Sequence, residues 1–330
     1  MRSTGVPWTV AAVSLLLASL LVSLRYGSVS LDWATVIRSF TELSGTDEQI
    51  VRELRVPRTL IGLGVGASLA VAGALMQAVT RNPLADPGIL GVNAGASLAI
   101  IVAIFVLGIS APTSYVWFGL AGAAVSATAV YALGSGGRGG MTPTKVTLAG
   151  AVLAALLSSF TSAIMLLDER SLDQFRFWMV GSIAGRDMAV AAAVAPFMVT
   201  GLVLALAMSR SVNVLVLGAE VARSLGQNVT RVRLAVAGAV VLLAGSAVAA
   251  AGPIAFMGLA VPHIVRLIVG PDYRKILLYS LLGGPVILLA ADVVGRLVIR
   301  PAELQVGIAT AIVGAPLFIV LARRRQLGRV

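Results

Sequence analysis

The sequence contains no cysteine and a single histidine, His263. Without cysteine the chain can form no disulfide, no thiolate metal site and no cysteine nucleophile, and one histidine cannot make a histidine-rich metal centre. Lysine is almost as scarce: the two lysines are Lys145 and Lys275, and neither follows a glycine. A P-loop needs Gly-Lys-Ser/Thr to hold phosphates. We therefore expect no ATP hydrolysis, no bound cofactor and no enzymatic activity in this chain.

Charged and aromatic residues are also few. They make up 12% and 5% of the 330 residues, whereas 58% are hydrophobic. Soluble domains contain roughly 45–50% apolar and about 25% charged residues. The chain has too little polar surface to cover its apolar residues, so a water-soluble globule is excluded and lipid must surround most of the chain.

The apolar residues fall into eight stretches that lack Asp, Glu, Lys and Arg. A helix needs about 20 apolar residues to cross the hydrocarbon, and two of the stretches, residues 87–137 and 234–265, are long enough for two crossings each. We predict an all-α, polytopic membrane protein with about ten transmembrane helices in a single domain over residues 1–330. The predicted spans are residues 7–24, 58–80, 88–108, 115–133, 145–167, 188–208, 234–252, 254–270, 276–298 and 304–322.

Basic residues are unequally divided between the two sides of these spans. Short loops rich in Lys and Arg stay in the cytoplasm. With both termini cytoplasmic, fifteen of the 25 Lys and Arg residues but only three of the 14 acidic residues lie on the inner side. We predict this orientation, with the first span retained as a helix. The net charge of +11 then reflects membrane insertion, and we expect no nucleic-acid partner.

Two segments rich in proline and glycine interrupt the apolar helices, at residues 81–88 and 252–263. At membrane depth such segments free backbone groups that need a protein or water partner. One segment lies on the inner side and the other on the outer side. This placement suggests two halves of opposite orientation, the inverted repeat common in transporters.

Several ordered motifs resemble one transporter family. They are Arg-Asn-Pro-Leu-Ala-Asp-Pro-Gly-Ile-Leu-Gly at 81–91, Leu-Gly-Ala-Glu-Val-Ala-Arg-Ser-Leu-Gly at 217–226, Gly-Pro-Ile-Ala-Phe-Met-Gly-Leu-Ala-Val-Pro-His-Ile-Val-Arg at 252–266, Glu-Leu-Gln-Val-Gly at 303–307 and Gly-Ala-Pro-Leu-Phe at 314–318. From residue 55 onward the chain resembles the permease subunits of the iron-siderophore and vitamin B12 ABC importers, the FecCD type.

The resemblance implies a multi-pass protein of the bacterial cytoplasmic membrane that moves a ferric siderophore or related metal-chelate inward by ATP-driven alternating access. It also implies three kinds of protein partner. These are a second permease, as another copy or a paralogue, two cytoplasmic ATP-binding subunits and an extracytoplasmic substrate-binding protein. The alternative is an ion- or proton-coupled secondary transporter, in which Asp292 and His263 are the candidate coupling residues.

Residues 217–226 can form a short inner helix with an apolar face at Leu217, Val221 and Leu225, which follow one another at intervals of four. The resemblance implies that this segment is the coupling helix that docks into the ATPase. The alternative is an amphipathic helix on the bilayer surface. The implied contact residues are Leu217, Gly218, Val221, Ala222, Arg223, Leu225 and Gly226.

Two further sites are implied by the resemblance. Arg55, Arg58 and Arg296 are expected at the outer side, where they would receive acidic residues of the binding protein. Alternatively these arginines extend to the interface, or Arg296 pairs with Asp292 four residues earlier. Pro143 and Thr144 are placed at a cytoplasmic gate. The same residues are equally compatible with an ordinary helix start, capped by Thr142 or Thr144.

Overall fold

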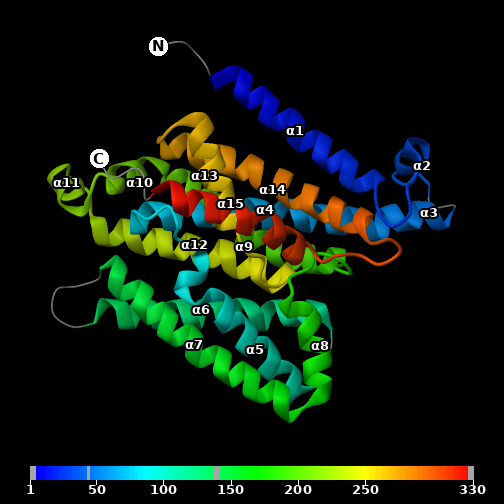
Figure 1. Cartoon of the computed structure of the whole chain (residues 1–330), viewed down its shortest axis with the longest axis horizontal. Helices are drawn as coiled ribbons and strands as arrows, with labels where there is room; N and C mark the ends of the chain where they lie inside the picture. Colours follow the sequence, from blue (N-terminus) through cyan, green and yellow to red (C-terminus); the bar gives the residue numbers. More distant parts are fainter. Residues whose placement is uncertain (1–4, 43–44, 110, 137–141, 326–330) are drawn as a thin grey trace.

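The computed structural model describes residues 5–42, 45–109, 111–136 and 142–325, and within these ranges every regular element is helical. Figure 1 shows their arrangement. The helices are α1 (Gly5–Arg25), α2 (Trp33–Arg38), α3 (Thr46–Gln49), α4 (Val56–Thr80), α5 (Val92–Leu107), α6 (Pro112–Ser135), α7 (Pro143–Leu167), α8 (Glu169–Met179), α9 (Met188–Ala207), α10 (Ser209–Val216), α11 (Ala219–Ser224), α12 (Val229–Ala251), α13 (Met257–Val269), α14 (Tyr273–Val298) and α15 (Val306–Arg325). A π-helical turn, Ile50–Arg55, leads into α4, and a 3-10 turn, Pro87–Leu90, precedes α5.

Among the described residues, seven helices are long and apolar enough to cross a membrane: α1, α4, α6, α7, α9, α12 and α14. The prediction of an all-α polytopic membrane protein is therefore confirmed. The other three predicted spans contain shorter apolar helices, namely α5, α13 and the first part of α15. The number of ten crossings accordingly stays a prediction.

The predicted span at 254–270 begins later than expected, at Met257. Residues 252–256 between α12 and α13 are not helical, and both ends of this segment have a positive φ: 74° at Gly252 and 67° at Phe256. Proline 253 has no backbone N–H to continue a helix. The sequence signal for a broken helix was thus correct, and the break is wider than the Gly-Pro pair itself.

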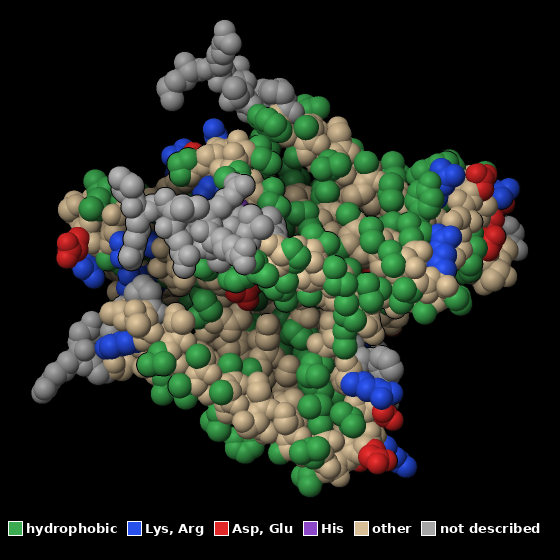
Figure 2. Space-filling view, in the orientation of Figure 1, with side chains coloured by type: hydrophobic (Ala, Val, Ile, Leu, Met, Phe, Trp, Pro, Cys, Tyr) green, Lys and Arg blue, Asp and Glu red, His purple; other side chains and the backbone are tan. Residues whose placement is uncertain are grey.

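Charged side chains gather at the two ends of the bundle, and apolar side chains cover much of the surface between them (Figure 2). α10 and α11 lie at one end, whereas α2, α3 and α8 lie at the other (Figure 1). α1 begins and α15 finishes toward the α10–α11 end. Following the predicted orientation, we call the α10–α11 end the inner end and the opposite one the outer end.

α4 forms the centre of the bundle and packs against α14, α12, α13 and α9. Its small residues allow this packing because they let helix backbones approach closely. A Cβ atom on Gly66 would lie 2.7 Å from the backbone of Pro285 in α14, and one on Gly73 would overlap the backbone of Gly258 in α13. Small residues along α4 therefore fix where its neighbours cross it.

The two irregular segments found in the sequence meet at this crossing. A Cβ on Gly258 would lie 2.9 Å from Cδ of Pro87 and 3.0 Å from Oδ2 of Asp86. The 3-10 turn Pro87–Leu90 also contacts α5, α6 and α7. These three helices pack on one another, and α6 also packs on α12. α1 runs along the opposite edge, mainly against α14 (Figure 1). The centres of both segments are thus buried in protein, at Ala85 and Pro87 and at Gly252 and Ile254, as their unpaired backbone groups require.

Candidate functional site

At the inner end, the predicted coupling segment, residues 217–226, contains one short helix, α11, and α10 directly precedes it. α10 is followed by Leu217 and Gly218, and Gly218 has a φ of 118° that turns the chain into α11. Leu217, Val221 and Leu225 are 62%, 43% and 64% exposed. Ala222 faces the other way and is fully buried against Leu215 and Val229. The three apolar side chains are therefore uncovered, but the helix is shorter than predicted: Leu217 caps the end of α10, Gly218 turns the chain, and Leu225 follows the last residue of α11.

The remaining residues of this segment shape its end. Arg223 is exposed, and Gly226 has a φ of 78°. The backbone N–H of Gln227 donates to the carbonyl of Ala222 at 2.9 Å, while the Gln227 amide donates to the Ser211 carbonyl in α10 at 2.9 Å. These bonds fold the chain back, so that α10 and α11 form one compact unit.

Hydrogen bonds tie α10 to the start of α14. Asn213 donates to Oδ1 of Asp272 at 2.6 Å and accepts from the backbone N–H of Tyr273 at 2.8 Å. This bond from Asn213 lowers the pKa of the Asp272 carboxyl. The inner segment is therefore fixed to a long helix of the bundle.

The contacts continue from α14 into the centre of the molecule. Arg266 of α13 donates to the Tyr273 hydroxyl at 3.0 Å and to the Gln77 side-chain oxygen at 3.1 Å. Gln77 of α4 in turn donates to the carbonyl of Gly258 at 3.2 Å. We call Asn213, Asp272, Tyr273, Arg266 and Gln77 the inner polar chain. It joins α10 to the point where α4 and α13 cross.

The predicted gate residues lie at the start of α7. Pro143 occupies the first helical position, and Thr144 is exposed. Thr142 caps the helix, since its hydroxyl accepts from the backbone N–H of Lys145 at 3.3 Å. The alternative explanation, a capped helix start, is therefore present in the structure. A gating role for Pro143 and Thr144 stays a prediction.

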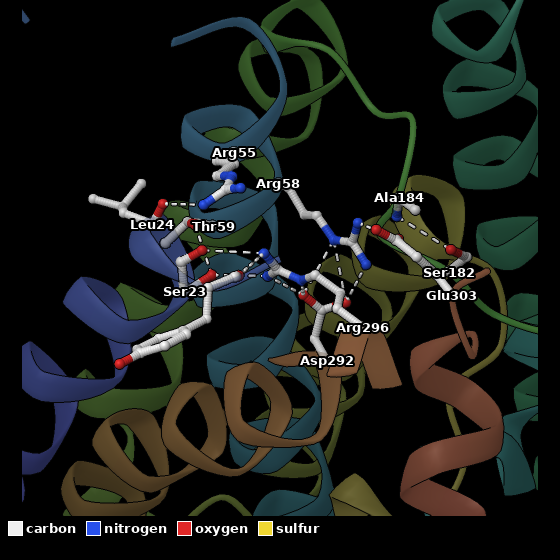
Figure 3. A network of polar contacts seen from close by, with 11 residues as sticks. Ser23, Leu24, Arg55, Arg58, Thr59, Ser182, Ala184, Asp292, Arg296 and Glu303 are labelled. Carbon is white, nitrogen blue, oxygen red and sulfur yellow. Dashed lines mark hydrogen bonds and ion pairs between the residues drawn. The ribbon is translucent and has the colours of Figure 1, made fainter. Parts of the chain in front are cut away.

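At the outer end, one buried carboxylate lies between two arginines (Figure 3). Asp292 of α14 accepts from Nη2 of Arg58 at 2.8 Å and from Nε of Arg296 at 2.9 Å. Arg58 also donates to Glu303 at 2.6 Å. The Asp292 side chain is 1% exposed, so these ion pairs connect α4, α14 and the segment before α15 inside the protein.

Arg296 also binds the end of α1. It donates to the carbonyls of Ser23 and Tyr26 at 3.1 and 3.0 Å and to the Ser23 hydroxyl at 3.0 Å. Arg55 acts in the same way, since it donates to the carbonyls of Leu24, Arg25 and Val29. Both arginines therefore stabilise the last turn of α1 and the chain beyond it.

These contacts do not fit the expectation that Arg55 and Arg296 receive acidic residues of an outside partner, whereas for Arg58 that expectation stays a prediction. Arg55 and Arg296 are only 5% and 2% exposed, because interior carbonyls and Asp292 bind their guanidinium groups. The Arg58 side chain is 12% exposed. The alternative that Arg296 pairs with Asp292 is confirmed. Glu303, Asn213 and Gln77 carry no local sequence signal of their contacts, since their partners are distant in sequence.

Comparison with known proteins agrees with this fold and with the motifs. The model of the FecCD transport family matches residues 15–324. The probable siderophore transport system permease protein YfiZ of Bacillus subtilis (strain 168) is 45% identical over 316 residues, which cover 96% of this chain and 95% of YfiZ. The Fe(3+)-citrate import system permease protein YfmD of the same organism is 50% identical over 281 residues, 85% of this chain and 83% of YfmD.

A solved structure of a metal-chelate type ABC transporter in an inward-facing conformation is also similar. It superposes with a TM-score of 0.85 at 28% sequence identity, covering 95% of this chain and 98% of that chain. The fold is therefore shared over nearly the whole length. The family match and the identity with YfiZ together show that this chain belongs to the FecCD transport family.

Proposed function

We propose that the chain is the membrane-spanning permease of an ATP-driven importer that carries a ferric siderophore or a related metal-chelate into the cell. It works with a second permease, two cytoplasmic ATP-binding subunits and an extracytoplasmic binding protein. Alternating access moves the chelate: the binding protein delivers it at the outer end, and ATP binding on the partner subunits drives the change that releases it inward. The relatives YfiZ and YfmD, named for siderophore and ferric citrate transport, support this class of cargo.

The uncovered apolar face on the inner segment carries the proposal. Leu217, Val221 and Leu225 expose apolar side chains at the inner end, next to the charged residues Glu220 and Arg223. An apolar cluster rimmed by charges is typical of a protein contact. The ATP-binding subunit is the partner that an importer permease needs at this end.

The inner polar chain gives this contact a route into the bundle. A partner that pushes on α11 moves α10 with it, because the two helices are joined by backbone and side-chain hydrogen bonds. Asn213 passes the movement to α14, and Arg266 and Gln77 pass it to the crossing of α4 and α13. That crossing is where both irregular segments lie, so it is the place where the helices can change their relative positions.

The coupling role is tested with Leu225→Asp. We expect the variant to insert normally but to lose co-purification with the ATP-binding subunit, because a carboxylate would have to be buried in the contact. The matched control is Ile37→Asp, an equally exposed apolar residue on α2 at the outer end. If L225D retains the ATP-binding subunit as well as I37D does, α11 lies on the bilayer surface instead and the coupling assignment is wrong.

The energy source is tested by uptake of ⁵⁵Fe-labelled chelates in a deletion strain that carries the chain and its partner subunits. We expect uptake to stop when ATP is depleted and to continue when an uncoupler collapses the proton gradient. The opposite result would favour a proton-coupled transporter. The ion pairs of Asp292, one of the two candidate coupling residues, with Arg58 and Arg296 favour the first outcome.

Docking of the binding protein is assigned to the outer end, around Arg58. Of the three predicted arginines, Arg58 has the most accessible side chain, and it holds Glu303 at the surface of the network. Arg55 and Arg296 support this region from inside by fixing the end of α1. Charge reversal at Arg58 should weaken binding-protein affinity at low salt more than at high salt, as expected of a steering charge.

A further inference from the structure

A groove of about 240 Å³ lies between the inner half of α1 and α13. α1 lines one wall of the groove, α13 lines the other, and α14 forms its base, which includes Tyr279 and Gly283. Figure 1 shows α1 lying along the edge of the bundle, where it packs mainly against α14. The wall on α1 includes Ala11 and Ala12, whose side chains are too short to close the space toward α13.

The walls of the groove are apolar. Their side chains are hydrocarbon apart from the indole of Trp8 and the phenol of Tyr279. The Tyr279 hydroxyl is hydrogen-bonded to the Thr9 hydroxyl at 2.7 Å, so it already has a partner. Few polar groups therefore face a ligand here, whereas a hydrocarbon chain would bury apolar surface on both walls.

The groove lies at the depth of the inner lipid leaflet. Its residues on α14 run from Tyr279 to Ile287, which is about 12 Å of helix at a rise of about 1.5 Å per residue. One leaflet contributes about 15 Å of hydrocarbon, half of the bilayer core. Trp8 is half exposed at the inner end of the groove, and tryptophan is enriched at the membrane–water interface. An acyl chain that enters beside Trp8 would thus follow the groove toward the middle of the bilayer.

A lysine lies at the inner end of the groove. Lys275 precedes Tyr279 by one helical turn and Gly283 by two, so the three residues share one face of α14. Lys275 is exposed, and among the described residues no carboxylate forms an ion pair with it. Asp272, the nearest acidic residue in the sequence, already accepts a hydrogen bond from Asn213. The Lys275 ammonium can therefore extend to the lipid headgroups beside the groove.

We propose that the groove binds an anionic phospholipid of the inner leaflet, with one acyl chain between α1 and α13 and the phosphate at Lys275. Anionic lipids of the cytoplasmic leaflet attract basic side chains at the membrane surface. Lys275 directs this attraction to a lipid whose acyl chain the groove accepts. The bound lipid fills the space between α1 and α13, and it holds the inner end of α1 as the arginines Arg55 and Arg296 hold the outer end.

The headgroup contact is tested by native mass spectrometry of the purified full-length chain in a neutral detergent, titrated with phosphatidylglycerol or phosphatidylcholine of identical acyl chains. We expect the first phosphatidylglycerol to bind about fivefold more tightly than phosphatidylcholine, the effect of one basic side chain on an anionic lipid. Lys275→Gln should remove most of this preference. The matched control is Arg231→Gln, which removes an exposed basic residue at the start of α12, outside the groove, and should leave the preference unchanged.

The acyl-chain contact is tested by filling the groove. Gly283→Leu places a side chain there, and its Cβ would make ordinary contacts with Val261 and Val265 at 3.7 and 3.9 Å. Ala12→Leu fills the same space from α1, so the test holds even if one of the two variants does not fold. Both should weaken phosphatidylglycerol binding, whereas Gly238→Leu on α12, where a Cβ would have no atom within 4 Å, should not. Normal elution from a sizing column shows that a variant is folded.

Equal binding of the two lipids by the unmodified chain would overturn the proposal, and so would an equal preference for phosphatidylglycerol in K275Q and R231Q. If G283L and A12L bind phosphatidylglycerol as tightly as G238L does, the acyl chain does not enter the groove and the site is wrong. If the two groove variants instead elute as a smaller assembly while lipid binding stays the same, another protein chain covers the groove and the lipid assignment is wrong.

Discussion

Removing the negative charge of Asp292 should destabilise the protein more than any other change of one carboxylate at the outer end. Asp292→Asn keeps the size and shape of the side chain and one accepting oxygen. It leaves Arg296, which is 2% exposed, without a buried counter-ion, and it leaves Arg58 with Glu303 alone. The perturbation is therefore electrostatic, with little change in packing.

The magnitude follows from the cost of an unpaired buried charge. Breaking a buried ion pair by removing one partner costs about 3–5 kcal/mol. Because the asparagine oxygen still accepts one hydrogen bond, we expect the lower end, about 3 kcal/mol. Because the entropy of unfolding grows with chain length, a change of this size lowers the unfolding temperature by about 4 °C in a chain of 330 residues.

The assay is the loss of the monodisperse peak after stepwise heating in detergent. The control is Asp173→Asn on α8, whose ion pair with Arg176 joins two side chains that are 65% and 56% exposed. Exposed pairs contribute about 0–1 kcal/mol, so the control should melt with the unmodified chain. Adding Arg296→Met to D292N should recover part of the loss, since it removes one unpaired cation. If D292N melts within 1 °C of D173N, the outer network does not stabilise the fold in the way described.

Two further predictions concern packing and the inner polar chain. Gly73→Ala should abolish folded protein on a sizing column because its Cβ would overlap the Gly258 backbone, whereas Gly238→Ala, with no atom within 4 Å of the new Cβ, should be tolerated or stabilise α12 by about 0.4–1 kcal/mol; similar yields would refute the close crossing. Asn213→Ala should lower ATP-driven uptake while leaving assembly with the ATP-binding subunit intact. The same substitution should also reduce the dependence of folding stability on pH. The pKa of Asp272 is lowered in the folded protein, so this residue adds stability above its unfolded pKa of about 4, and that stability is lost as the pH falls further. The unmodified chain should therefore lose more stability than N213A between about pH 5 and 3, as followed by thermal melts, and parallel curves would contradict the assignment.

The membrane-spanning helices could be predicted from the sequence because each charged residue is costly to place in lipid. Stretches without charged residues therefore mark the spans. Each predicted span contains a helix in the structure, and the broken region at Gly252 was visible from its Gly-Pro pair. The i,i+4 pair of Asp292 and Arg296 was also within reach of sequence reasoning, since four residues make one helical turn. The spans and the Asp292–Arg296 pair could both be predicted because each depends only on residues that are close together in the sequence.

The rest depends on contacts between residues far apart in the chain. Arg58 and Asp292 are separated by 234 residues, and Gln77 and Arg266 by 189. No periodicity in the sequence places such pairs together. For the same reason Arg55 was expected to face outward: its basic side chain gave no sign that the carbonyls at the end of α1 would surround it. Burial of a charge is decided by tertiary packing, which local patterns do not contain.

The way α1 is attached has a consequence for assembly in the membrane. Few of the side chains of α1 are buried: only 6% of the stretch Trp8–Arg25 lies inside the protein. Its last turn is held by the guanidinium groups of Arg55, in the π-helical turn before α4, and of Arg296 in α14. Arg55 follows α1 closely in the chain, but Arg296 is synthesised 273 residues after Ser23. Until then, Arg55 is the one of these two arginines that can hold the end of α1. The contacts that fix α1 against α14 can form only when the ninth predicted span is made, so the position of an early helix depends on a late one.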